Sequence, residues 1–161
     1  LSVDGKPALD VMREDLGERF GKDLNRIGGQ VFVGLPIRGS DTGDYLVPNL
    51  RGIDPQSKRI AIGELVQPGQ QVTFCRRDLD AAAEDMNRML ESIKKGLFGK
   101  PKGGVYYSCL ARGPNLFGRK SEELGMIREA LGEFPLVGFF CNGEISHNRL
   151  YGYTGVLTLF V

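Results

Sequence analysis

Apolar residues recur at the spacing of one helix face in two segments of the chain. The first segment runs from Pro7 to Gly21, and the second follows Asp78 and ends at Gly96. Proline suits the first turn of a helix, and an aspartate before it accepts hydrogen bonds from N–H groups that lack an intrahelical partner. Both segments are therefore predicted to be amphipathic helices, and a third helix is predicted over 121–131.

Short apolar segments bounded by turn residues predict the strands. Pro68 and Gly69 suit the two central positions of a type II turn, and residues 40–44 have turn composition. The three strands within 45–76 are predicted to form an antiparallel meander. The predicted strands are 30–37, 45–53, 58–63, 71–76, 104–109, 136–141 and 153–161.

The last third of the chain alternates strand, helix and strand. Two strands of one sheet that are joined through a short helix are parallel. The fold class is therefore predicted to be α+β, with a mixed, largely antiparallel sheet, helices packed on it and one β-α-β crossover near the C-terminus. Residues 1–161 are expected to form a single domain. Because the chain starts without a methionine, we expect this domain to be cut from a longer polypeptide.

Composition narrows the function classes. The chain has 161 residues and 41% hydrophobic content, which is enough for a core without disulfides. Lysine and arginine total 21 against 20 acidic residues, so the formal charge of +1 gives no general attraction to nucleic acid or to an anionic membrane. The longest apolar runs are far shorter than the roughly 20 residues that span a bilayer. Neither nucleic acid nor membrane is an expected partner.

Cysteine and histidine usage argues against metal sites and disulfides. The three cysteines have no CxxC spacing, which indicates a reducing, cytoplasmic setting. One histidine and scattered cysteines form no metal-ligand pattern. The 23 glycines include no nucleotide-binding motif, so no cofactor is expected.

Polar residues follow both strands of the predicted crossover. Loops after parallel strands leave from the same edge of a sheet, where ligand crevices form in α/β proteins. The first loop carries Cys109 and Arg112, the second carries Asn142 and Glu144, and Tyr153 opens the last strand. These five residues are predicted to line one ligand-binding site.

Three interpretations of these residues remain open. In the first, Arg112 holds the carboxylate and Glu144 the ammonium group of an α-amino acid. In the second, Arg112 and Glu144 bind each other or nearby backbone. In the third, Cys109 is a nucleophile and His147 its base, although a buried free cysteine is also an ordinary core residue. No residue set specifies a reaction, so the protein is not expected to be an enzyme.

The motifs of this last third resemble the FIST C-terminal domain, and the resemblance extends upstream to Asp4-Gly5-Lys6-Pro7-Ala8. Two positions depart from the usual family pattern, because Ala111 replaces a glycine and Tyr151 replaces a histidine. The matching motifs are Ser108-Cys109, Arg112-Gly113, Leu116-Phe117-Gly118, 135–140, Asn142-Gly143-Glu144-Ile145 and Leu150-Tyr151-Gly152-Tyr153-Thr154.

The resemblance implies an intracellular sensory module of a signal transduction protein. It also implies a preceding FIST N-terminal domain in the same polypeptide, a small ligand such as an amino acid, and a signalling protein as a further partner. Some family members belong to F-box proteins, where the domain helps to recruit protein substrates. A protein-interaction module is therefore the alternative function.

Overall fold

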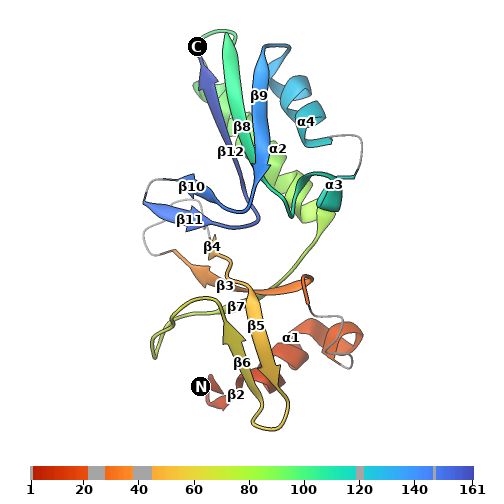
Figure 1. The fold of residues 1–161 in the computed structure, drawn as a ribbon, viewed down its shortest axis with the longest axis vertical. Coiled ribbons are helices and arrows are strands. Elements are labelled where there is room, and N and C mark those ends of the chain that lie inside the picture. The colour runs from red at the N-terminus through yellow and green to blue at the C-terminus, as the bar shows by residue number, and fades with distance from the viewer. Residues whose placement is uncertain (1, 22–27, 38–44, 119–121, 147) are drawn as a thin grey trace. The chain divides into compact units, whose positions relative to one another are not determined.

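The structure is a computed structural model, and the chain divides into two compact units, Leu1–Arg77 and Asp78–Val161 (Figure 1). Each unit combines helix with small sheets, so the predicted α+β class is confirmed. The predicted turn at 40–44 and His147 lie outside the described residues. The structure describes residues 2–21, 28–37, 45–118, 122–146 and 148–161.

The N-terminal unit contains helix α1 (Ala8–Gly21), which confirms the first predicted helix apart from a non-helical break at Gly17. All strand pairs in its described residues are antiparallel: β1 pairs with β2, β3 lies between β4 and β7, and β5 pairs with β6. The strands are β1 (Ser2–Val3), β2 (Lys6–Pro7), β3 (Val31–Pro36), β4 (Tyr45–Leu46), β5 (Leu50–Asp54), β6 (Arg59–Ile62) and β7 (Thr73–Arg76).

The predicted meander over 45–76 is wrong in its connections. The segment 45–53 is split into β4 and β5, which belong to different sheets, and Pro48 lies at the break. Proline has no N–H to donate to a strand ladder. The turn at Pro68-Gly69 does form, with the Gln70 N–H donating to the Gln67 carbonyl at 3.1 Å. After this turn β7 pairs with β3 and not with β6.

The core of the N-terminal unit lies between α1 and its strands. Leu9 and Met12 of α1 are fully buried and pack with Val31 of β3. Around them lie partly buried residues of β5, β6 and β7. The apolar spacing that predicted the helix therefore also identifies the face that packs.

The C-terminal unit begins with α2 (Leu79–Gly96), whose N-cap Asp78 accepts a hydrogen bond from the Ala81 N–H at 3.1 Å, as predicted. Its main sheet has the order β12-β8-β9, with β8 and β9 parallel and β12 antiparallel to β8, so the predicted crossover is confirmed. The hairpin β10-β11 was not predicted. The remaining elements are β8 (Gly103–Cys109), α3 (Gly113–Leu116), α4 (Glu122–Leu131), β9 (Leu136–Cys141), β10 (Glu144–Ser146), β11 (Arg149–Tyr151) and β12 (Gly155–Phe160).

The two faces of this sheet differ in burial. On one face, Tyr106 of β8 packs with Met86 and Leu90 of α2 and with Ile127 of α4, and these residues form the core of the unit. On the other face, Phe139 of β9 remains 65% exposed. The helices therefore cover one face of the sheet, and this covered face is where buried polar groups from strand and helix meet.

Candidate functional site

Strand β8 presents alternate residues to the two faces of its sheet. Tyr106 and Ser108 both donate hydrogen bonds to Glu123 of α4, so they face the helices. The ring of Tyr107 instead meets the ring of Phe139, with the two centroids 5.0 Å apart. Because side chains alternate along a strand, two separate polar clusters form at the end of β8, one on each face.

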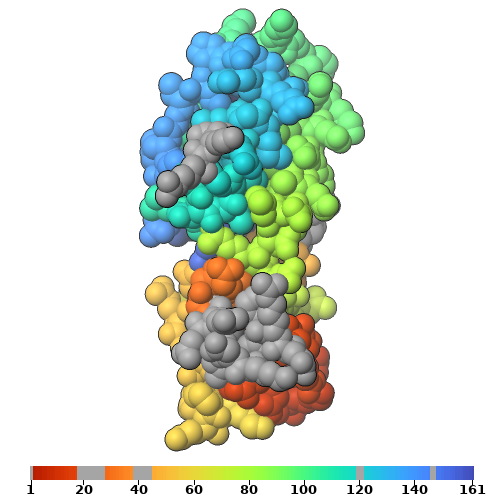
Figure 2. All heavy atoms as spheres, turned by 90° about the vertical axis from the view of Figure 1, so that its right-hand side faces the viewer, coloured from red at the N-terminus to blue at the C-terminus, as the bar shows by residue number. Residues whose placement is uncertain are grey.

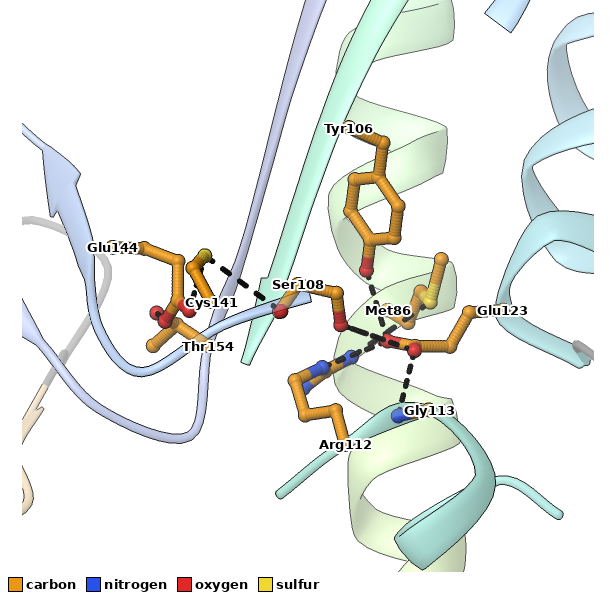
Figure 3. A network of polar contacts seen from close by, with 9 residues as sticks. All are labelled: Met86, Tyr106, Ser108, Arg112, Gly113, Glu123, Cys141, Glu144 and Thr154. Atoms are coloured by element: carbon orange, nitrogen blue, oxygen red, sulfur yellow. Dashed lines mark hydrogen bonds and ion pairs between the residues drawn. The ribbon is translucent and has the colours of Figure 1, made fainter. Parts of the chain in front are cut away.

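Glu123 is the centre of the cluster on the helix face (Figure 3). It is 3% exposed and accepts hydrogen bonds from the Tyr106 hydroxyl at 2.9 Å and the Ser108 hydroxyl at 3.2 Å. It also accepts from Arg112 Nε at 2.8 Å and from the Gly113 backbone N–H at 2.9 Å. One carboxylate therefore joins α4 to β8 and to the start of α3.

Arg112 compensates the charge of Glu123. The two side chains are 12% and 4% exposed, so they form a buried ion pair, and the Arg112 guanidinium also lies 4.9 Å from the centroid of the Phe117 ring. Removing one partner of such a pair leaves an uncompensated buried charge. Burial, and then the charge of Glu123, raise the pKa of Tyr106 to about 12. The Tyr106 hydroxyl therefore stays a proton donor at neutral pH.

A cavity of about 390 Å³ adjoins this network. Segments α3 and α4, which contribute to its wall, form part of the surface seen in Figure 2. The volume is within the range of roughly 300–1,000 Å³ that is usual for small-ligand sites. The lining is mainly apolar, with a few polar groups: Tyr106, Ser108, Gly113, Pro114, Glu122, Glu123, Leu124 and 136–140.

Two glycines permit the close packing beside this cavity. Gly113 has a φ of 43°, and a side chain at this position would collide with the Phe140 ring. A side chain at Gly138 would collide with the backbone carbonyl of Tyr106 on the neighbouring strand. Glycine is therefore required at both positions, one for its backbone conformation and one for the approach of β9 to β8.

Glu144 is the centre of the second cluster, which includes Cys141 at the end of β9 (Figure 3). It is 3% exposed and accepts hydrogen bonds from the Thr154 hydroxyl at 2.7 Å and from the Cys141 thiol at 3.1 Å. Burial, and then the Glu144 carboxylate, raise the pKa of that thiol. Among the described residues, the hydrogen-bond partners of Glu144 are therefore both neutral.

The five residues predicted to line one site do not all lie in the same cluster. Arg112 pairs with Glu123, so the described contacts do not join Arg112 to Glu144. Cys109 is buried at 5% exposure, and its N–H donates to the Thr154 carbonyl at 3.0 Å. Asn142 is exposed, and Tyr153 has a positive φ of 64° at the turn before β12. Whether these residues bind a ligand stays a prediction.

Glu123 was missed by the reading of the sequence. It precedes Ile127 by four residues, so both lie on the face of α4 that packs into the core. A carboxylate on an otherwise apolar helix face signals a buried polar partner. That signal was available in the sequence, but it does not identify Arg112 as the partner.

The other candidate sites are weaker. A larger cavity of about 810 Å³ lies in the N-terminal unit, but its polar lining residues, which include Asp4, Arg59 and the glutamines at 67, 70 and 71, are largely exposed. In the described part of the chain, His, Cys, Asp and Glu side chains form no group of three that could hold a metal ion. No helix within the described ranges is long and apolar enough to cross a membrane.

Comparisons with known proteins give one family match and several uncharacterized relatives. A model of the FIST C domain matches residues 8–147, a span that includes parts of both compact units. The uncharacterized protein Rv0628c of Mycobacterium tuberculosis is 38% identical over 168 residues, and the uncharacterized protein Mb0898c of Mycobacterium bovis is 37% identical over 165 residues. Each match covers 98% of this chain but 43% of the relative, so the chain spans less than half of their length. No solved structure matches the chain significantly.

Proposed function

We propose, from the premise that this chain belongs to the FIST C domain family, that it is a non-catalytic sensory domain of a cytoplasmic signal transduction protein and binds a small ligand. The observation that carries the proposal is the cavity of about 390 Å³ beside Glu123. Mainly apolar cavities with a few convergent polar groups are the usual form of small-ligand sites. The Arg112–Glu123 pair holds the walls of this cavity in place.

The lining favours an amphipathic ligand. Leu124, Leu136 and Phe140 offer contacts to an apolar group. Glu122 is exposed and also lines the cavity, so its carboxylate can receive an ammonium group. An amino acid with an apolar side chain combines both features. In this arrangement Glu122 takes the cation-binding part that the sequence had assigned to Glu144, and Arg112 is a positioning residue.

The described contacts do not favour catalysis. Cys109, the candidate nucleophile, is 5% exposed and packed at the end of β8. Arg112 Nε donates its hydrogen bond to Glu123, and no described hydrogen bond joins Arg112 to the Cys109 thiol. A buried thiol that no described cation activates is a poor nucleophile toward a substrate from solution. These observations support a binding role.

A thermal-shift panel of the common amino acids tests the proposal. A ligand at about 100 times its Kd stabilises the protein by about 2.7 kcal/mol, which is readily seen in melting. We expect at least one apolar amino acid to raise the Tm. If none does and isothermal calorimetry also detects no heat of binding, the proposed ligand class is wrong.

A matched pair of variants locates the ligand. Leu124→Trp places a large side chain in the cavity wall, whereas Leu79→Trp changes a helix residue of equal exposure, 43% against 42%, that does not line the cavity. The rise in Tm caused by the amino acid should disappear in Leu124→Trp and persist in Leu79→Trp. Glu122→Gln should weaken binding of an amino acid while leaving the Tm of the free protein unchanged. A shift that survives Leu124→Trp would place the ligand elsewhere.

The uncovered sheet face favours a second candidate function, a protein-interaction module. Val137 and Phe139 of β9 and Phe160 of β12 are 69%, 65% and 56% exposed. Clustered exposed apolar residues mark interaction surfaces. We assign this face to the FIST N-terminal domain that the family resemblance implies, because the relatives are more than twice as long as the region they share with this chain.

Mixing this chain with a separately purified N-terminal domain tests that assignment. The control variant is Leu65→Lys, which changes an exposed leucine of the other compact unit. Wild-type protein and this control should both form a complex in size-exclusion chromatography. Phe139→Lys should not form it. Equal binding by all three proteins, or self-association of this chain through Phe139, would refute the assigned partner.

A further inference from the structure

Two cysteines end neighbouring parallel strands in register. Cys109 is the last residue of β8 and Cys141 the last residue of β9, and the two are paired in the register of the sheet. The strands are still hydrogen-bonded here, because the Leu110 N–H donates to the Cys141 carbonyl at 2.8 Å. Both cysteines are free thiols in this structure. Their backbones are therefore immediate neighbours.

The two thiols lie on the same face of the sheet. Tyr107 and Phe139 form the preceding pair of the same alternation, and their rings are in contact at 5.0 Å between centroids. Side chains two residues further along each strand return to that face. The thiols of Cys109 and Cys141 therefore follow the Tyr107–Phe139 contact side by side.

The spacing of the strands suits a disulfide. Neighbouring strands lie about 4.7–4.9 Å apart, and disulfides join Cα atoms that are about 4.4–6.8 Å apart. Cys141 is partly exposed and Cys109 is buried, so an oxidant from solution meets Cys141 first.

We propose that Cys109 and Cys141 form a peroxide-sensitive dithiol that closes to a disulfide. The thiolate of Cys141, which is the minor form because burial and Glu144 raise the pKa of the thiol, attacks one oxygen of hydrogen peroxide, so that an S–O bond forms, the O–O bond breaks and one water is released after protonation. The Cys109 sulfur then attacks the resulting sulfenic sulfur, the S–S bond forms, and a second water leaves. Two thiols and one peroxide thus give one disulfide and two waters.

Closure of this disulfide changes the surroundings of Glu144. In the reduced protein the Cys141 thiol donates a hydrogen bond to Glu144 Oε1 at 3.1 Å, and a disulfide has no such proton. Glu144 then keeps the Thr154 hydroxyl, which donates at 2.7 Å. Since Glu144 begins β10 and Thr154 precedes β12, oxidation acts on the segment that carries the β10-β11 hairpin. This inference is independent of the proposed ligand cavity.

Thiol counting and peptide mapping test the proposal. Treating the folded chain with one equivalent of hydrogen peroxide should lower the titratable thiols from the three of the reduced protein to one, with Cys75 remaining. Mass spectrometry should then find the peptides of Cys109 and Cys141 joined, in a monomer, and dithiothreitol should restore all thiols.

Matched variants separate this outcome from general oxidation. Cys75→Ser should form the bridge at the wild-type rate, whereas Cys141→Ser should form none and should keep its other thiols under the same treatment. The proposal is overturned if the wild-type protein proceeds to Cys141 sulfinic acid without a bridge. It is also overturned if the joined peptides include Cys75, or if the bridge appears only after denaturation.

Discussion

Glu123 and Glu144 are equally buried, each at 3% exposure, but they lie on opposite faces of the sheet and have different partners. Glu123 binds a guanidinium, two hydroxyls and a backbone N–H, so its charge is compensated. Among the described residues, Glu144 binds one thiol and one hydroxyl, both neutral. A charge that is compensated internally holds elements together, whereas a charge held by neutral donors responds to any change in those donors. The first arrangement suits the wall of a binding site, and the second suits a switch.

The largest expected difference between the two carboxylates is in stability. Glu123→Gln leaves Arg112 buried without its counter-charge, so we expect a loss of about 3–5 kcal/mol in the free energy of unfolding. Glu144→Gln removes no ion pair among the described residues and should cost about 1 kcal/mol. Urea unfolding measures both, and Glu122→Gln serves as the exposed neighbour, with a change below about 0.5 kcal/mol. Equal losses at positions 123 and 144 would remove the distinction.

Tyr106 provides a test of the Glu123 network through pH. Its pKa is raised to about 12 by burial and by Glu123, so the folded state keeps the phenolic proton when the unfolded state has lost it. The stabilisation is therefore complete below about pH 10 and declines as the pH rises toward 12. Wild-type protein should lose more stability over this interval than Tyr106→Phe, and at neutral pH the variant should be weaker by about 1.5–3 kcal/mol.

Tyr107→Phe is the control for this measurement, because Tyr107 lies on the opposite face of the same strand and contacts Phe139. Its stability should decline with pH as the wild type does. If Tyr106→Phe and Tyr107→Phe had the same pH profile, the Tyr106 hydroxyl would not be coupled to Glu123.

The smallest effect is expected in the rate at which the Cys141 thiol is alkylated. The Glu144 carboxylate contributes to raising the pKa of its thiol, so Glu144→Gln should increase the fraction of thiolate near neutral pH. We expect alkylation of Cys141 by iodoacetamide to become faster by roughly tenfold or less. Peptide mass spectrometry gives the rate, with Cys75 as the internal reference. An unchanged Cys141 rate would show that Glu144 does not control this thiol.

The sequence predicted much of the fold because the relevant signals are local. Asp78 caps α2 as expected, and the apolar segment 136–141 is the strand β9 with the predicted bounds. The meander failed because strand partners are chosen by contacts distant in sequence, and Pro48 breaks the segment that was read as one strand.

Local signals also predicted some of the geometry around the candidate site. The parallel crossover correctly placed the loops after β8 and β9 at one edge of the sheet. The partner of Arg112 was not predictable, because it depends on the rotation of α4 about its axis, which brings Glu123 inward and leaves Glu122 exposed. The register of the strands decides whether two side chains at one edge lie on the same face of the sheet. A shift of the register by one residue moves a side chain to the opposite face.

A double-mutant cycle tests the central claim most directly, namely that Arg112 belongs to the Glu123 cluster and is separate from Glu144. The free energy of unfolding is measured for Arg112→Gln, Glu123→Gln, Glu144→Gln and the two double variants that contain Arg112→Gln. We predict a coupling energy of about 1–3 kcal/mol between Arg112 and Glu123, and a value within about 0.5 kcal/mol of zero between Arg112 and Glu144. The reverse result, strong coupling to Glu144 and none to Glu123, would contradict the account.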